Sequence, residues 1–298
     1  MADAAVAAIE WVRRFNRTVT QRIGALDDGY LARGRPLGAS RLLWEIGAGG
    51  NDVRSLRIRL GLDSGYLSRL LRSLEQDGLV RVEPDPSDRR VRTVRLTAGG
   101  EAEREVLDRL SDDLARDLLD PLSESQRARL VDAMGVVERL LTAGLVEVGV
   151  EGASSDAARF CMRSYVAELD RRFDAGFDPE RSISADPDEL TEPVGLLLVA
   201  RLHDEPIGCG ALKFHDRAPV EIKRMWVATA ARGLGVGRRI LSELEQHARD
   251  RGARVARLET NRALGEAINL YRSTGYTEVD PFNDEPYAHH WFEKPIAT

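Results

Sequence analysis

The segment ARGLGVGRRIL, residues 231–241, holds three glycines at alternate positions among arginines. Glycine at this density weakens a helix or a strand, so some other requirement must keep it there. The apolar run EIKRMWV precedes the glycines and an amphipathic pattern follows them, which predicts a turn from a strand into a helix N-terminus. Amides at a helix N-terminus lack backbone acceptors, and the helix dipole adds positive potential. The turn is therefore predicted to bind phosphate.

Three phosphate-containing ligands compete for such a turn. A P-loop requires glycine, lysine and serine or threonine where this chain has Gly237, Arg238 and Arg239. A dinucleotide-binding turn requires a third glycine where Arg238 stands, although Glu259 follows about one strand later, as a ribose-binding acid would. The strands expected before the turn look antiparallel, which disfavours the dinucleotide. Coenzyme A is the third ligand.

The pattern Arg232-x-x-Gly235-x-Gly237 after EIKRMWV, with EAINLYRSTGY further on, resembles the GNAT superfamily of N-acetyltransferases over residues 146–295. This resemblance implies acetyl-CoA as co-substrate, with its pyrophosphate on the turn and its pantetheine arm paired to the preceding strand. On this basis the coenzyme-binding residues are Met225, Val227, Arg232, Gly233, Leu234, Gly235, Val236, Gly237 and Arg238. Asn261 and Asn269 are added as candidates for binding the coenzyme.

The chemistry of acetyl transfer assigns further roles. An alkylamine is mostly protonated at neutral pH, so a base must remove a proton before the amine attacks the thioester. Glu221, on the strand before the turn, is predicted to be this base, directly or through water; the alternative is a structural or substrate-binding carboxylate. A backbone amide near Val227 is expected to polarise the thioester oxygen. Tyr271 matches the family position for the acid that protonates the departing thiolate.

Two residues near the end of the sequence are candidates for lining the substrate cleft, Tyr287 and His290. A structural role for the histidine is the alternative. The five histidines and two cysteines show no metal-ligand spacing, so no metal is predicted.

The first half of the chain carries a locally basic segment, although the formal net charge of the whole chain is −6. Residues 52–62 and 63–80 read as two short helices joined by a glycine-containing turn, which is a helix-turn-helix. Asp63 and Ser64 are good N-caps, and Gly78 ends the second helix. The apolar face of that helix consists of Leu67, Leu70, Leu71 and Leu74. Its opposite side, with Ser64, Tyr66, Ser68, Arg69 and Arg72, suits a DNA major groove.

The next residues, LVRVEPDPSDRRVRTVRLT at 79–97, read as two strands around a turn that presents Arg89 and Arg90. Asp88 is expected to hold the Arg90 side chain by a charge-assisted hydrogen bond. This order, followed by two long helices, resembles the MarR family of transcriptional regulators over residues 5–145. The resemblance implies a homodimer formed by the terminal helices and a wing arginine that reaches the minor groove of double-stranded DNA. A winged helix used only for protein contacts is the alternative.

The length of 298 residues favours two domains, predicted at residues 1–145 and 146–298. The fold class is α+β: a mainly helical winged helix-turn-helix domain, then an α/β domain with a mixed, largely antiparallel sheet. Helices are predicted at 5–26, 102–119, 123–142, 152–173, 234–252 and 265–275, and strands at 194–202, 206–214, 220–227, 253–260 and 289–294. Two cysteines, no long apolar run and no basic leader predict a cytoplasmic protein without a membrane partner.

These features together predict a bifunctional protein: a DNA-binding regulator that also acetylates a small primary amine. The first alternative is a regulator whose second domain only senses acyl-CoA or a metabolite without turnover. The second alternative is a protein acetyltransferase that uses the winged helix to reach nucleoid proteins.

Overall fold

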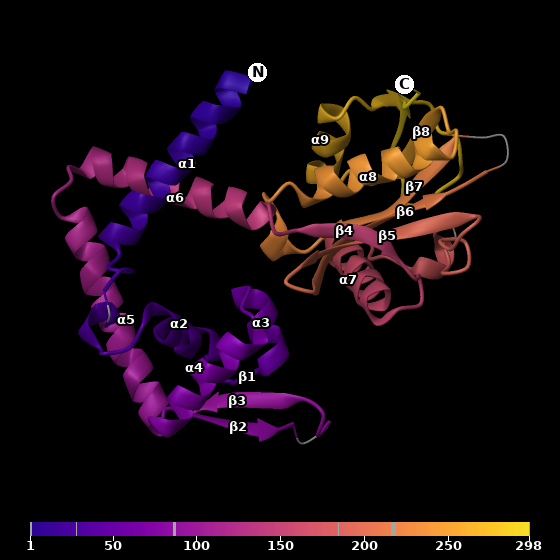
Figure 1. The fold of residues 1–298 in the computed structure, drawn as a ribbon. Coiled ribbons are helices and arrows are strands. Elements are labelled where there is room, and N and C mark those ends of the chain that lie inside the picture. The colour runs from indigo at the N-terminus through magenta and orange to yellow at the C-terminus, as the bar shows by residue number, and fades with distance from the viewer. Residues whose placement is uncertain (1, 28, 86–87, 184, 216–218, 298) are drawn as a thin grey trace. The chain divides into compact units, whose positions relative to one another are not determined.

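The computed structural model describes residues 2–27, 29–85, 88–183, 185–215 and 219–297 (Figure 1). The chain divides into two compact units, Met1–Ala133 and Met134–Thr298. The division falls inside helix α6 (Glu124–Ala143), ahead of the boundary between residues 145 and 146 that the sequence predicts. No helix among the described residues is long and apolar enough to cross a membrane.

The N-terminal unit is mainly helical. Its sheet has the order β1-β3-β2, with every pair antiparallel. Its elements are α1 (Ala2–Arg22), η1 (Tyr30–Ala32), α2 (Leu37–Ile46), β1 (Asn51–Asp52), α3 (Val53–Leu60), α4 (Ser64–Gln76), β2 (Val80–Pro84), β3 (Arg92–Leu96), α5 (Ala98–Leu119) and the start of α6.

The predicted helix-turn-helix and wing are confirmed. The Asp52 carboxylate caps α3 by accepting from the amides of Arg54 and Ser55, and Asp63 caps α4 in the same way. Gly61, at φ 61°, ends α3 in the left-handed conformation that glycine favours. The four predicted leucines of α4 are all buried. The wing is the hairpin of β2 and β3; its predicted turn includes Pro86 and Ser87, which lie outside the described residues.

Two details of this unit differ from the sequence prediction. Helix α2 was not predicted, yet its Leu42, Leu43 and Ile46 are among the most buried side chains of the unit. Helix α1 ends at Arg22 rather than near residue 26, because Gly24 takes a φ of 68° that interrupts the helix.

The C-terminal unit is built on a seven-stranded sheet of order β4-β5-β6-β7-β8-β10-β9. All neighbouring strands are antiparallel except β7 and β8, which are parallel, so the predicted mixed, largely antiparallel sheet is confirmed. The strands are β4 (Glu147–Glu151), β5 (Gly195–Leu202), β6 (Glu205–Lys213), β7 (Val220–Val227), β8 (Val255–Thr260), β9 (Thr277–Val279) and β10 (His290–Pro295). Strands β4 and β9 were not predicted.

Helices cover both faces of this sheet, as Figure 1 shows. Leu196 and Leu198 of β5 pack with α8 (Val236–Asp250), whereas Leu197 and Val199 pack with α7 (Asp156–Arg172). Because successive strand side chains point to opposite faces, α7 and α8 lie on opposite sides of the sheet. This double coverage explains the continuous apolar run of β5. Helix α9 (Gly265–Ser273) joins the core cluster of α8 through Ile268 and Tyr271.

Strands β7 and β8 separate after a short ladder. Their register pairs Val220 with Ala256 and Glu221 with Arg257 only. Further along β7, Arg224 has a φ of 56° and the register with β6 shifts. Both are signs of a β-bulge, which bends a strand and disrupts its pairing. The free edge of β7 that results is where the candidate site lies.

Candidate active site

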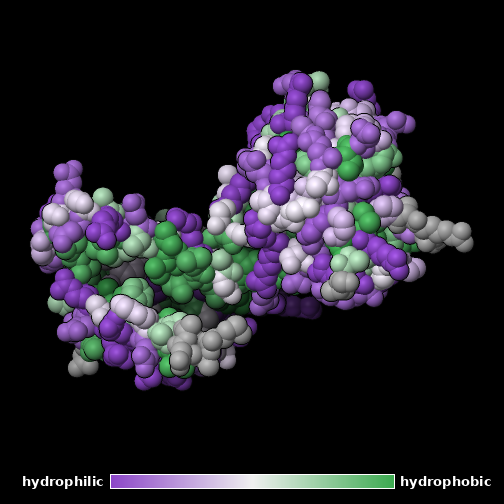
Figure 2. Space-filling model, turned by 90° about the horizontal axis from the view of Figure 1, so that it is seen from above, coloured by the Kyte–Doolittle hydropathy of each residue, from purple (hydrophilic) through white to green (hydrophobic). Residues whose placement is uncertain are grey.

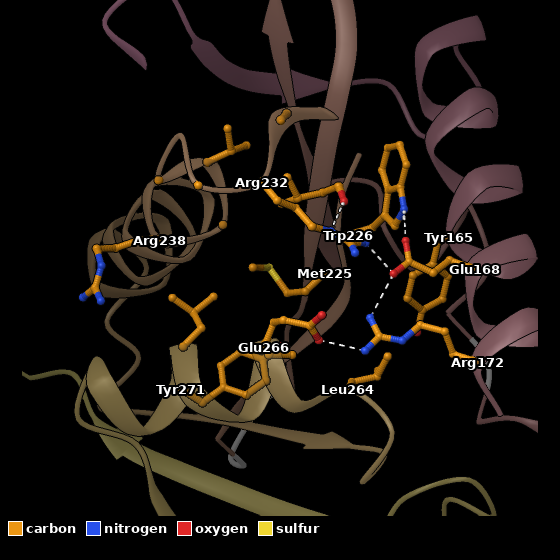
Figure 3. Close-up of a pocket in the computed structure, with 18 of the residues that line it drawn as sticks. Tyr165, Glu168, Arg172, Met225, Trp226, Arg232, Arg238, Leu264, Glu266 and Tyr271 are labelled. Atoms are coloured by element: carbon orange, nitrogen blue, oxygen red, sulfur yellow. Dashed lines mark hydrogen bonds and ion pairs between the residues drawn. The ribbon is translucent and has the colours of Figure 1, made fainter. Parts of the chain in front are cut away.

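A cavity of about 470 Å³ lies where β7 and β8 have separated (Figure 3). Its walls come from α7, the end of β7, the glycine turn, the start of α8, and α9. The structure brings most of the predicted coenzyme and catalytic residues to it: Met225, Val227, Arg232, Gly233, Gly235, Val236, Gly237, Arg238 and Tyr271. Leu234 is not part of this lining and packs against the core cluster of α8 instead.

The glycine turn has the backbone geometry that a phosphate site needs. Gly233 and Gly235 take φ values of 84° and 76°, which side-chain-bearing residues rarely adopt. Gly235 is also the N-cap of α8 and supplies no capping side chain, so the first amides of the helix have no acceptor within it. A Cβ on Gly237 would approach Leu270 Cδ2 to 3.3 Å, so this glycine allows α9 to pack closely.

A network of charged side chains ties α7 to the turn and to α9. The Glu168 carboxylate accepts hydrogen bonds from Arg232, from Arg172 at 3.1 Å and from the Trp226 indole at 3.1 Å. Arg172 also donates to Glu266 at 2.7 Å. Burial raises the pKa of Glu168, but the hydrogen bonds from the two arginines outweigh it and lower that pKa. The carboxylate is therefore charged at neutral pH.

Glu168 and Arg172 were not among the predicted site residues, although their spacing of four residues on a predicted helix was visible. Their network also changes the expected role of Arg232, whose guanidinium is committed to Glu168 and to the carbonyl oxygen of Val227 at 3.3 Å. In Figure 3, Arg238 lies on the other side of the cavity from this network. Its guanidinium donates to Ser273 Oγ at 3.0 Å.

A second, smaller cavity of about 80 Å³ adjoins the first. The two share the residues Tyr165, Leu169, Met225, Leu264, Ala267 and Tyr271. The smaller cavity is further lined by aromatic side chains (Phe173, Phe177, Tyr287) and by charged ones (Lys223, Arg224, Glu259, Glu285). Two adjoining cavities with a shared wall suit a reaction between two molecules, one in each cavity.

Tyr271 belongs to that shared wall. Its side chain is 4% exposed and packs against the rings of Tyr276 and Phe292, with centroids 5.9 and 6.0 Å away. Burial raises the pKa of Tyr271 above its ordinary value of 10.0. The phenol therefore keeps its proton at neutral pH, which is the form that a general acid requires.

Glu221 does not lie where the sequence prediction required. Its carboxylate accepts from Arg257 at 2.6 Å and lies 3.2 Å from Lys223 Nζ, and it lines neither cavity. Burial raises the pKa of Glu221, but the two cations outweigh it and lower that pKa. A buried, doubly paired carboxylate with a low pKa is poorly suited to take a proton. The reason is register: Glu221 sits where β7 is still paired with β8, before the strands separate.

The remaining predicted residues are divided between the cavities and the surface. Asn261 and Tyr287 line the second cavity, where Asn261 Nδ2 donates to the Tyr287 carbonyl at 2.7 Å. Asn269 is exposed and lines neither cavity. His290 also lines neither; its Nδ1 lies 2.6 Å from Glu278 Oε1. Among the described residues, no group of three or more His, Cys, Asp or Glu is arranged to hold a metal.

In the N-terminal unit, most predicted DNA contacts are exposed: Ser64, Ser68, Arg69, Arg72, Arg89 and Arg90. Tyr66 is half-buried, with the Arg69 guanidinium 5.8 Å from its ring centroid. The prediction that Asp88 bonds to the Arg90 side chain is wrong. Asp88 accepts a hydrogen bond from the backbone amide of Arg90 at 3.0 Å, and this contact shapes the turn. The donor is the amide and not the Arg90 guanidinium.

Large apolar side chains are exposed on the long helices at both ends of the predicted regulator domain. On α1 they are Val6, Ile9, Trp11, Val12 and Phe15, and on α6 they are Val131, Met134, Val136, Leu140 and Leu141. Figure 2 shows hydrophobic side chains gathered on the surface among mostly hydrophilic ones. Apolar patches of this kind mark contact surfaces for other molecules.

Known proteins match both halves of the chain. The acetyltransferase (GNAT) family matches residues 162–276, and the MarR family matches residues 41–91. The IAA acetyltransferase of Azospirillum brasilense is 35% identical over 136 residues, which cover 44% of this chain and 88% of that protein. An uncharacterized N-acetyltransferase of Schizosaccharomyces pombe is 32% identical over 108 residues, which cover 33% of this chain and 66% of that one.

Among solved structures, an acetyltransferase of the GNAT family from Staphylococcus aureus is 14% identical, with a TM-score of 0.44, and the match covers 51% of this chain and 99% of that one. The chain belongs to the GNAT acetyltransferase family and also contains a MarR family domain.

Proposed function

We propose that the C-terminal half transfers the acetyl group of acetyl-CoA to a primary amine. The observation that carries this proposal is the position of Tyr271 on the wall shared by two cavities, one of which ends at the glycine turn. The larger cavity suits the coenzyme: the first amides of α8 face the pyrophosphate, and the free edge of β7 at Met225 and Val227 pairs with the pantetheine amides. The smaller cavity then holds the amine.

The reaction proceeds by direct attack. The amine nitrogen, entering from the smaller cavity, forms a bond to the thioester carbonyl carbon, and an amide of β7 near Val227 stabilises the oxygen that becomes negative. The carbon–sulfur bond then breaks, and its electron pair leaves on sulfur. The Tyr271 hydroxyl donates its proton to this thiolate. The amine loses one proton in the process, so a base is needed on the acceptor side.

Glu259 replaces Glu221 as our candidate base. It lines the smaller cavity, at the end of β8 that has separated from β7. One carboxylate oxygen pairs with Lys223, and the other accepts from Asn283 at 3.4 Å. The second contact is long, so this oxygen keeps a lone pair for the proton of an incoming amine or of a bridging water.

The N-terminal half is proposed to bind double-stranded DNA as a homodimer. Arg69 and Arg72 lie on the exposed side of α4, opposite its buried leucines, which is the arrangement of a recognition helix. The exposed apolar side chains of α1 and α6 supply the dimer contact. Two copies of α4 related by a two-fold axis then read the two half-sites of an operator.

The test is release of free thiol from acetyl-CoA in the presence of a panel of primary amines. Amine-dependent release supports the enzyme. No release from any amine, together with a coenzyme-dependent change in DNA affinity, instead supports a regulator that senses acyl-CoA. Acetylated lysines on proteins recovered with the chain would favour a macromolecular acceptor over a small amine.

A further inference from the structure

Arg224 is a non-glycine residue in a conformation that favours glycine. It lies within β7 at a φ of 56°, where the register with β6 shifts. A side chain in this region costs conformational energy that a glycine at the same bulge would avoid. A strained non-glycine residue at a site points to a contribution from its side chain that glycine could not make.

The guanidinium of Arg224 is a cation at the smaller cavity without an acidic partner among the ion pairs of the described residues. Its neighbour Lys223 is different, because it pairs with both Glu221 and Glu259. Arg224 instead lies 5.5 Å from the centroid of the Tyr165 ring, a cation–π distance that holds the guanidinium in place without neutralising its charge.

The acidic groups of this cavity are already engaged. Glu259 pairs with Lys223. Glu285 accepts from the amide of Ile183 at 2.7 Å and from the hydroxyl of Ser182 at 3.0 Å, two residues that also line the cavity. The remaining wall is aromatic: the ring centroids of Phe173 and Phe177 lie 5.8 and 4.9 Å from that of Tyr287. Within the part of the chain that the structure describes, the cavity therefore offers a cation without an acidic partner, Arg224, beside an apolar wall.

We propose that Arg224 binds a carboxylate of the acetyl acceptor, so that the acceptor is a small apolar amino acid or a similar amine that carries a carboxylate. This inference rests on the proposed acetyl transfer. The planar guanidinium matches a carboxylate with two parallel hydrogen bonds. Arg224 directly precedes Met225, which belongs to the wall shared with the coenzyme cavity. A carboxylate on Arg224 thus leaves an amine a few bonds away directed toward Tyr271, with the apolar side chain against Phe177 and Tyr287.

The experiment compares matched acceptors. Phenylalanine, tryptophan, leucine and valine are each paired with the amine that lacks only the carboxylate: phenethylamine, tryptamine, isoamylamine and isobutylamine. Thiol release from acetyl-CoA gives kcat/KM, expressed per unprotonated amine. We expect the wild-type chain to favour at least one amino acid over its partner by about tenfold or more, the value of a charge-assisted hydrogen bond.

Three variants separate recognition from folding. Arg224→Gln should lower kcat/KM for the amino acid to that of its partner amine and leave the partner's value within about twofold. Arg224→Lys should keep part of the preference for the amino acid, because lysine retains the positive charge but lacks the planar guanidinium that makes two parallel hydrogen bonds. Arg163→Gln, an exposed arginine of α7 that lines neither cavity, is the matched control and should keep the full preference.

Other results overturn the inference. Equal rates for every pair in the wild-type chain, or equal losses for both members of a pair in Arg224→Gln, would remove Arg224 as a carboxylate site and leave acetyl transfer standing. If no amine releases thiol, the proposed function fails. Calorimetric binding of the same amino acids to the coenzyme-loaded chain then decides the inference, which requires binding that Arg224→Gln abolishes.

Discussion

The carboxylate of Glu168 on α7 accepts a hydrogen bond from the guanidinium of Arg232, a residue 64 positions later at the start of the glycine turn. This contact couples the helix that walls both cavities to the turn that is proposed to hold the coenzyme. It also keeps Trp226 in place, since the same carboxylate accepts from the indole. Glu168 is thus a positioning residue for the site.

Replacing Glu168 with glutamine should reduce both stability and coenzyme affinity. The change leaves Arg232 and Arg172 without their shared anion, which costs about 2 kcal/mol of unfolding free energy. Chemical denaturation measures this loss, and Glu205→Gln, an exposed glutamate of β6, is the matched control. A Glu168→Gln variant as stable as the wild type would show that the network contributes nothing.

The contribution of Glu168 to stability should depend on pH in a defined direction. Its pKa in the folded chain lies below the ordinary 4.5, so the carboxylate stabilises the fold above that pH. The stabilisation is lost as the pH falls through the folded pKa. The difference in unfolding free energy between wild type and Glu168→Gln should therefore be constant near neutral pH and shrink below about pH 4.5.

Tyr271→Phe should lower kcat by about a hundredfold, as expected when a general acid is removed, and leave the dissociation constant of coenzyme A nearly unchanged. The variant keeps the ring that packs against Tyr276 and Phe292, so its melting temperature should stay close to that of the wild type. Because the pKa of Tyr271 is raised, this group should cause no fall in wild-type kcat below about pH 10. Full activity in Tyr271→Phe would exclude the phenol as the proton donor.

Gly235→Val should abolish coenzyme binding, because valine at a φ of 76° distorts the turn that presents the amides of α8. Gly252→Val is a matched control: Gly252 has a φ of 80°, also has open space around it, and lines neither cavity. Both variants should lose similar stability, and only the first should lose coenzyme binding in calorimetry. Equal loss of binding in both would mean that general destabilisation, and not the turn, is responsible.

Replacing Arg69 and Arg72 together with alanine should weaken DNA binding and leave acetyl transfer intact. Removing one arginine–phosphate ion pair should reduce the slope of log affinity against log salt by about 1, and removing one hydrogen-bonded arginine–base pair should cost about 1–3 kcal/mol. Fluorescence anisotropy over a salt series measures both effects. Arg109→Ala, an exposed arginine of α5, is the control. Unchanged affinity in the double variant would assign the recognition surface to another element.

Leu140→Asp combined with Leu141→Asp should convert the proposed homodimer into a monomer, because these side chains are 69% and 68% exposed in the single chain. Burying two carboxylates in an apolar contact is strongly unfavourable. Light scattering measures the mass of the particle. Val194→Asp, at an exposed position just before β5, should leave the mass unchanged. A mass independent of all these changes would mean that α6 is not the dimer contact.

Much of the architecture was predictable because its signals are local. The leucines of α4 recur at helical spacing, the cap at Asp63 begins a helix, and the glycines of the turn permit positive φ. These effects operate between residues a few positions apart. Helix α2 and the short strands β4 and β9 were missed, since their formation depends on partners far along the chain.

Local patterns along the chain were enough to predict that a glycine turn precedes a helix and that a tyrosine follows at the family spacing. Which carboxylate lines the smaller cavity could be seen only once the strands were placed in the sheet. In β7, Val220 and Ile222 pack toward α8, but after the bulge at Arg224 the residues that do so are Met225 and Val227. One inserted residue reverses the alternation of the strand. Glu221 lies before this bulge, where β7 is still paired with β8, and is held in a buried ion pair, whereas Arg224 and Glu259 line the smaller cavity. Both placements depend on pairing across the sheet, which joins residues far apart in the sequence.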